Sequence, residues 1–189
     1  MAVVRRKRNR QAPSRLSLRD TGENLLTSKQ VRQMYDNYGF NNSLENLHRF
    51  IEALGIRLVS KPMKDSQSGF MHKEGDGWVV GVNNLHHPNR QRFTLAHELG
   101  HYFLHRNICK NFDDNYVFTR ADEKSDPIEW EANRFAAEFL MPEDIFRQMV
   151  VKGVTSVDDI ADQFGVSTMA VRIRAKTLGM QGHGLNEKI

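Results

Sequence analysis

One stretch decides the fold, Phe93-Thr94-Leu95-Ala96-His97-Glu98-Leu99-Gly100-His101-Tyr102-Phe103-Leu104-His105. It contains no proline and is predicted to be helical. Residues four apart share a face of an α-helix, so His97 and His101 project from one side, one above the other. Two imidazole nitrogens in this arrangement can bind one tetrahedral zinc ion. Glu98 points about 100° away from His97, where it can take a proton from a water molecule on the metal.

The residues around this motif favour a buried helix. Leu95, Leu99 and Phe103 recur every four positions and can pack into a core. Gly100 costs about 1 kcal/mol of helix stability relative to alanine, so we expect another element to approach closely there. The competing interpretation is a core helix with two hydrogen-bonded histidines, and a third ligand elsewhere in the chain decides against it.

A second helix, predicted over residues 128–141 and ended by Pro142, carries three acidic side chains. Glu131 recurs with Arg134 and Glu138 on what we interpret as a charged, solvent-facing side held by ion pairs within the helix.

Glu129 does not belong to that charged side. It flanks the apolar stripe together with Asn133, and polar groups held among apolar side chains need polar partners. We therefore choose Glu129 over Glu131 as the third metal ligand, since a catalytic zinc usually takes three protein ligands and one water. Asn133 lies one turn further on and is expected to orient a ligand histidine.

The segments RQRFTLAHELGHYFLH, from Arg90 to His105, and EWEANRFAAEFLMP, from Glu129 to Pro142, together resemble the ImmA/IrrE family of metallopeptidases. The resemblance extends over roughly residues 42–180. It implies a zincin-like domain of the gluzincin type, with Zn²⁺ held by the positions His97, His101 and Glu129 and with Glu98 as the catalytic residue. It also implies a protein substrate, typically a helix-turn-helix repressor controlling a stress response or a mobile element.

Composition excludes several other classes. The chain is 39% hydrophobic and 26% charged, and no apolar run approaches the roughly 20 residues that span a bilayer. Cys109 is the single cysteine, so neither an intrachain disulfide nor a cysteine zinc site can form. Without an apolar stretch behind the basic N-terminus we expect no secretory signal, no membrane association and a cytoplasmic location.

The net charge of +4 comes from one end of the chain. Residues 1–19 contain seven of the 27 Lys and Arg side chains and none of the 23 acidic ones. The remainder therefore has 20 basic and 23 acidic side chains, a net charge of −3. We interpret residues 1–27 as a solvated, disordered tail; contact with nucleic acid is the less favoured interpretation.

The predicted fold class is α+β: a small antiparallel sheet packed on a zincin-type pair of active-site helices, followed by a helix-turn-helix-like segment. The expected divisions are the tail 1–27, a peptidase domain 28–152, a helical segment 153–180 and a tail 181–189. Before the motif we expect two helices, a short strand and a hairpin. They are placed at 28–38, 43–54, 56–60, and 69–72 with 78–82.

Three further expectations concern the surroundings of the motif. The strand at 78–82 could add an extended substrate along its edge. His86 and His87 are assigned to a surface turn, and His105, about 6 Å beyond His101 along the axis, to a supporting or structural role. A short strand is expected at 116–119, in an otherwise polar loop with a solvated acidic character.

The C-terminal segment leaves an alternative open. Ser156 and Ser167 are predicted to cap two helices separated by Gly165, which is the helix-turn-helix pattern. A DNA reader would place its polar contacts near the start of the second helix, yet the basic side chains lie further on, so packing or substrate docking is favoured. The competing functions are a DNA-binding regulator with a structural metal and a metal-dependent amidase acting on a small molecule.

Overall fold

The computed structural model describes residues 25–114, 126–154 and 156–180. Within these ranges the chain forms seven α-helices, one π-helical turn and four strands. The helices are α1 (Ser28–Asn37), α2 (Leu44–Ala53), α3 (Pro88–Gly100), α4 (Pro127–Leu140), α5 (Glu143–Val151), α6 (Val157–Phe164) and α7 (Thr168–Thr177). The π-helical turn η2 (His101–His105) continues α3, and the strands are β1 (Arg57–Lys61), β2 (Gly69–Glu74), β3 (Gly77–Asn83) and β4 (Asn111–Asp114). The α+β class is confirmed.

The described strands form one sheet in the order β1-β3-β2-β4. β2 and β3 form the predicted antiparallel hairpin, in which Phe70 lies opposite Gly81. β4 is antiparallel to β2, whereas β1 is parallel to β3. Because β3 is paired on both sides, the expectation that residues 78–82 offer a free edge is wrong. Its run of apolar residues is typical of a central strand instead.

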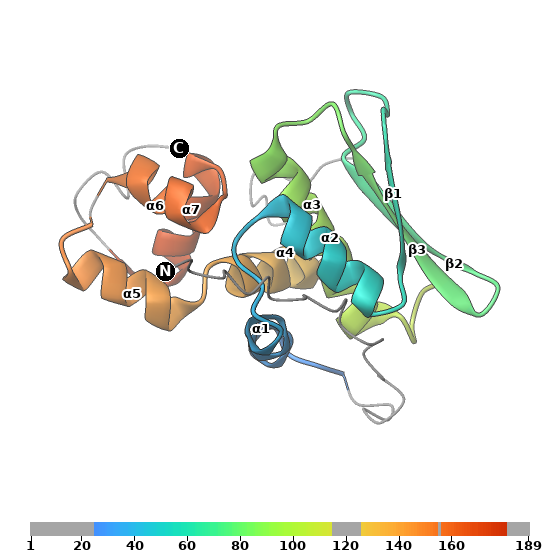
Figure 1. The fold of residues 1–189 in the computed structure, drawn as a ribbon, viewed down its shortest axis with the longest axis horizontal. Coiled ribbons are helices and arrows are strands. Elements are labelled where there is room, and N and C mark those ends of the chain that lie inside the picture. Colours follow the sequence, from blue (N-terminus) through green and yellow to red (C-terminus); the bar gives the residue numbers. More distant parts are fainter. Residues whose placement is uncertain (1–24, 115–125, 155, 181–189) are drawn as a thin grey trace, which may run out of the picture.

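Helices cover one face of this sheet. In Figure 1, α2 and α3 lie beside the strands, and α4 lies on the side of these two helices that faces away from the sheet. α5, α6 and α7 gather at the other end of the molecule. Leu95, Leu99 and Phe103 are fully buried in the resulting core, as their spacing predicted. The helix that carries the histidines is therefore held between the sheet and α4.

Side-chain caps define where the helices start. Thr27 forms a capping box with Gln30 at the start of α1, and Ser43 caps α2. Ser156 and Ser167 cap α6 and α7, each accepting from a backbone N–H three residues ahead. A serine or threonine cap is worth about 1 kcal/mol, and all these helices begin within a residue or two of their predicted starts.

Gly100 lies where α3 crosses α4. A Cβ atom added there would lie 3.0 Å from Ala132 Cα and 3.1 Å from Ala132 O, so the close approach predicted at this position is present. α3 makes extensive contact with α4 as a result. The crossing sets the distance between the two helices that carry the candidate ligands.

The helix around the motif differs from its prediction at both ends. It begins at Pro88, whose missing N–H costs nothing in the first turn. After Gly100 the chain widens into the π-helical turn η2. π-Helices are rare overall, but those that occur are often found at functional sites.

Some predicted segments lie wholly or largely outside the described residues. They are the strand at 116–119, the tail 181–189 and all but the last three residues of the tail 1–27. The strand that the structure does show in this part of the chain is β4, so Asp113 and Asp114, expected in an acidic loop, belong to the sheet.

Candidate metal centre

α3 and the start of η2 bring two imidazoles together. His97 is fully buried and His101 is 1% exposed, and their Nε2 atoms lie 3.0 Å apart. The rings are nearly perpendicular, at 82°, and the short distance between their Nε2 atoms places both nitrogens at the same site. The predicted pairing of these two side chains on one helix face is therefore present in the folded chain.

α4 adds a carboxylate to the same place. Glu129 Oε2 lies 3.1 Å from His97 Nε2, and Glu129 Oε1 lies 3.3 Å from His101 Nε2. Each of the three residues offers one ligand atom, all within 4.8 Å of one another, and such a group could hold a metal ion. Two imidazoles with one carboxylate is a donor set found in catalytic zinc proteins, so the residues present fit a divalent metal.

The electrostatics of the group favour the ligand forms of its side chains. Burial lowers the pKa of His101, which keeps the ring neutral. Burial acts to raise the pKa of Glu129, but the two neighbouring imidazoles of His101 and His97 outweigh it and hold the pKa well below its usual range. A neutral imidazole and an ionised carboxylate are the forms that bind metals.

Asn133 supports His97 as predicted. Its Oδ1 lies 3.0 Å from His97 Nδ1, so that ring nitrogen donates its proton to the amide oxygen. The other nitrogen, Nε2, then keeps its lone pair on the side that faces Glu129. Such outer partners fix the orientation of a ligand histidine.

Glu98, the predicted catalytic residue, is fully buried beside the histidine pair in the sequence. It faces the start of β2, because a Cβ added at Gly69 would lie 3.2 Å from Glu98 Oε1. The same added atom would also meet Thr94 Cγ2 at 2.5 Å and Gly81 O at 2.8 Å. A larger residue at position 69 would therefore collide with α3, and the glycine leaves room for this carboxylate.

Two neighbours of the centre, Phe112 and Glu131, were not predicted, whereas His105 was expected in a supporting or structural role. Phe112 of β4 stacks on the His101 ring, with centroids 4.3 Å apart and planes 13° apart. Glu131, expected on a solvent-facing side, is about half exposed, but its Oε2 lies 2.9 Å from His105 Nε2. His105 itself is buried and contacts His101 through their Nδ1 atoms, 3.1 Å apart.

The remaining candidates lie apart from this group. His87 caps α3, accepting from the Asn89 N–H, and His86 contacts the Asn83 side chain, in agreement with their assignment to a turn. Tyr102 follows His101 in the chain; it packs edge-to-face on Trp78, and burial raises its pKa.

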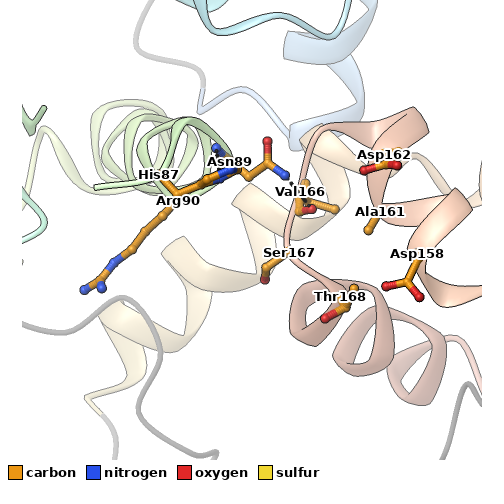
Figure 2. A pocket seen from close by; sticks show the side chains of 9 residues that line it. All are labelled: His87, Asn89, Arg90, Asp158, Ala161, Asp162, Val166, Ser167 and Thr168. Atoms are coloured by element: carbon orange, nitrogen blue, oxygen red, sulfur yellow. Dashed lines mark hydrogen bonds between the residues drawn. The ribbon is translucent and has the colours of Figure 1, made fainter. Parts of the chain in front are cut away.

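A pocket of about 310 Å³ lies elsewhere, between the start of α3 and the α6–α7 pair. Figure 2 shows Asp158 and Asp162 of α6 beside Ser167 and Thr168 at the start of α7, whereas the Arg90 side chain extends away from them. None of the three candidate ligands lines it. The pocket therefore lies between α3 and the α6–α7 pair and is separate from the metal centre.

The α6–α7 pair is fastened to the motif helix. The buried Arg92 guanidinium donates to the carbonyls of Phe164 and Gly165, where α6 ends. Arg174 of α7 is also buried and donates from Nε to the Met141 carbonyl. These contacts favour packing over DNA reading, because a side chain engaged in the protein interior cannot contact a base.

Similarity to known proteins gives the class of this protein. The family that matches the chain and the names of its relatives indicate a metallopeptidase. A family model described as Peptidase_M78, IrrE N-terminal-like domain, matches residues 51–176, and the chain belongs to this family. The family was the one expected from the two sequence motifs, and the finding confirms that expectation.

Several curated proteins are similar to the chain. The metallopeptidase ImmA of Bacillus subtilis is 24% identical over 159 residues, which cover 82% of this chain and 89% of that protein. The radiation response metalloprotease IrrE of Deinococcus deserti is 28% identical over 145 residues, covering 75% of this chain but 46% of IrrE. The chain thus matches ImmA over most of its length and IrrE over about half.

A solved structure shares the fold. It is a transcriptional regulator of Mycobacterium tuberculosis, with a TM-score of 0.57 and 20% identity. The match covers 85% of this chain and 49% of that one.

Among the described residues, no helix has the length and apolar character needed to cross a membrane.

Proposed function

We propose that the chain is a zinc-dependent endopeptidase of the HExxH, gluzincin type. The observation that carries this proposal is the meeting of His97 and His101 with Glu129, while Glu98 is adjacent to His97 on the same helix. A structural zinc site is normally closed by four protein ligands, whereas a catalytic one keeps a position open. Within the described ranges this group contains three.

The residues divide the chemistry between them. A zinc ion, when bound, lowers the pKa of a water ligand to about 7 and polarises a carbonyl. His97, His101 and Glu129 would hold the ion. Glu98 would take the proton of the attacking water and return it to the leaving amine. Its complete burial keeps the carboxylate away from bulk water, and the polypeptide backbone at Gly69 leaves the space for it.

The extended part of a protein substrate has one well-placed edge to follow. Among the described strands, β4 is the edge next to the histidines, since its Phe112 stacks on His101. An added strand gains affinity from main-chain hydrogen bonds and specificity from alternate side chains. We propose that the substrate aligns with the edge strand β4, because β3 is paired on both sides.

We propose a helix-turn-helix repressor as the substrate, on the basis of the resemblance to the ImmA/IrrE family. An immunity region protein of Bacillus phage phi105 is also similar, at 24% identity over 151 residues. The test incubates the zinc-loaded protein with helix-turn-helix repressors from the same genome and analyses the products by mass spectrometry. Cleavage at one site supports the proposal. An intact repressor, with another protein cleaved, would replace the substrate but keep the enzyme.

The catalytic assignment is tested by Glu98→Gln. We expect this variant to lose peptide hydrolysis by more than about 10²-fold, the lower end of general-base contributions, while it binds as much zinc as the wild type. Metal content is measured by atomic emission on the purified chain. Glu52→Gln, at an exposed position on α2, serves as the control and should keep both properties. Undiminished cleavage by Glu98→Gln would remove Glu98 from the mechanism.

The alternative function is a DNA-binding regulator whose metal is structural. This alternative rests on the helix-turn-helix-like segment. However, Arg174 donates to the Met141 carbonyl, and the Gly165 carbonyl at the turn accepts from Arg92. A gel-shift experiment at increasing salt separates the two functions. Specific, salt-dependent DNA binding without any proteolysis would favour the regulator. Proteolysis of the repressor that stops with a chelator would favour the enzyme.

A further inference from the structure

A buried chain of side chains extends from the candidate metal centre to the protein surface. His101 Nδ1 lies 3.1 Å from His105 Nδ1, and His105 Nε2 lies 2.9 Å from Glu131 Oε2. His101 and His105 are each 1% exposed, whereas Glu131 is about half exposed. The connection therefore begins beside Glu129 in the interior and ends on an exposed carboxylate of α4.

The two ends fix the direction of every hydrogen bond between them. An ionised carboxylate only accepts hydrogen bonds, so His105 must donate from Nε2 to Glu131. A neutral imidazole that donates from one nitrogen accepts at the other, so His105 Nδ1 accepts the proton of His101 Nδ1. His101 Nε2 is then left with its lone pair, and this is the atom that lies 3.3 Å from Glu129 Oε1.

The packing around the two rings holds this arrangement in place. Phe112 stacks on His101 and also lies against His105, with ring centroids 6.3 Å apart. The widened turn η2 carries both histidines, which changes the offset between them from that of a regular α-helix. Neither ring can turn over without losing a buried hydrogen bond, which costs about 1–3 kcal/mol.

We propose that His105 and Glu131 are positioning residues that act on the metal through His101. Together they select the His101 tautomer that offers Nε2 to the ion, and the carboxylate makes this nitrogen a stronger donor to the metal. Asn133 does the same for His97, so each ligand imidazole has its own outer partner. This inference rests on the proposed metal site and assigns functions to two residues outside it.

The experiment measures the zinc dissociation constant of the full-length chain by competition with a chromophoric chelator. Removing an outer partner typically weakens metal affinity 10- to 100-fold. We expect about 100-fold for His105→Phe, which keeps a ring against Phe112 but cannot accept. His105→Asn, whose Oδ1 can accept in place of Nδ1, should recover part of the loss, and Glu131→Gln should cost about tenfold. Glu143→Gln, in an exposed ion pair with Arg147, is the matched control and should change nothing.

A second measurement reports the tautomers directly. In the ¹⁵N-labelled, zinc-loaded protein, long-range ¹H–¹⁵N spectra should show a proton on His105 Nε2 and none on His105 Nδ1. Glu131→Gln is expected to fold normally because its side chain reaches solvent, so it answers the question even where His105→Phe does not fold. A proton on His105 Nδ1, or zinc affinity unchanged within twofold in Glu131→Gln, would overturn the proposal.

These outcomes are separate from those of the proposed function. A wild-type chain that binds zinc, shows the expected tautomers and cleaves no peptide supports the connection and overturns the peptidase. A chain that cleaves its substrate while the variants bind zinc as well as the wild type does the reverse. A wild-type chain that takes up no zinc overturns both.

Discussion

At the scale of single residues, the partner of each imidazole matters as much as the imidazole. His97 Nδ1 lies 3.0 Å from Asn133 Oδ1. We expect Asn133→Ala to weaken zinc binding by about 10- to 100-fold, because the ring loses the acceptor that fixes its tautomer. Chelator competition measures the change. Asn133→Asp keeps an acceptor and should bind zinc nearly as well as the wild type. Equal affinity in the alanine variant would show that Asn133 is not needed.

The same scale shows what could be predicted from the sequence. The sequence favoured Glu129 over Glu131 as a ligand because Glu129 lies on the same side of the helix as Asn133, near apolar neighbours. This choice needed only the period of one regular helix. Phe112 could not be predicted, since its contact with His101 depends on how β4 joins the sheet. Glu131 is exposed as expected, but its contact with His105 could not be predicted because it depends on how two helices pack against each other.

At the scale of elements, the crossing of α3 and α4 decides the geometry of the centre. We expect Gly100→Ala to destabilise the fold by about 1 kcal/mol, the net of an overpacking cost of about 1–3 kcal/mol and a helix-propensity gain of about 1 kcal/mol. The new Cβ would lie 3.0–3.1 Å from backbone atoms of Ala132, which cannot rotate away. Urea unfolding measures the stability, and zinc affinity should fall with it because Glu129 moves with α4.

A glycine with more room provides the control for this variant. A Cβ at Gly77 would lie 3.7 Å from its nearest neighbour, an ordinary contact. Gly77→Ala should therefore leave the zinc affinity unchanged. If Gly100→Ala kept both the wild-type stability and the wild-type zinc affinity, the crossing would be more tolerant than its distances indicate.

Elements that depend on long-range pairing were the hardest to predict. The hairpin of β2 and β3 follows from local alternation and turn residues, and its existence was expected. The order β1-β3-β2-β4 follows from contacts between distant segments, so the sequence pattern did not reveal that β3 lies inside the sheet. The π-helical turn is likewise invisible in the spacing of the histidines, because the four-residue interval from His101 to His105 also suits a regular helix.

At the scale of the whole molecule, metal binding should stabilise the fold. An ion that binds only the folded chain adds about 4 kcal/mol at a concentration 1,000 times its dissociation constant. For a chain of this size that corresponds to a rise in Tm of roughly 10 °C. We expect EDTA to lower the Tm of the zinc-loaded protein by this amount. Glu129→Ala should melt at nearly the same temperature with and without EDTA, and an unchanged wild-type Tm would contradict a metal site.

Stability should also depend on alkaline pH through Tyr35. Burial raises its pKa to about 12, and its hydroxyl donates to the Asn41 carbonyl at 2.6 Å. The unfolded side chain ionises near pH 10, so the folded state binds the proton more tightly, and the stabilisation is lost as the pH rises from 10 to 12. The loss corresponds to about 2–3 kcal/mol for a shift of this size. Urea unfolding of Tyr35→Phe should show a shallower fall in stability, whereas a parallel fall would point to other groups.

The molecule as a whole also explains why its C-terminal helices were ambiguous in the sequence. Their helix-turn-helix pattern is real, with caps at Ser156 and Ser167, and local rules were enough to place it. What the pair does depends on Arg92, which comes from the motif helix and satisfies the carbonyls at its turn. We therefore propose that residues 153–180 function as part of the peptidase unit.

The unequal exposure of the three candidate ligands has a consequence for how an ion arrives. Both imidazoles are sealed from solvent, whereas the Glu129 side chain is 38% exposed. An incoming cation would meet the carboxylate before either ring, so capture would proceed in order, first by charge at the rim and then by nitrogen within. The ion would leave by the same route, so the rate of metal dissociation would depend on how often the Glu129 side chain rotates toward solvent.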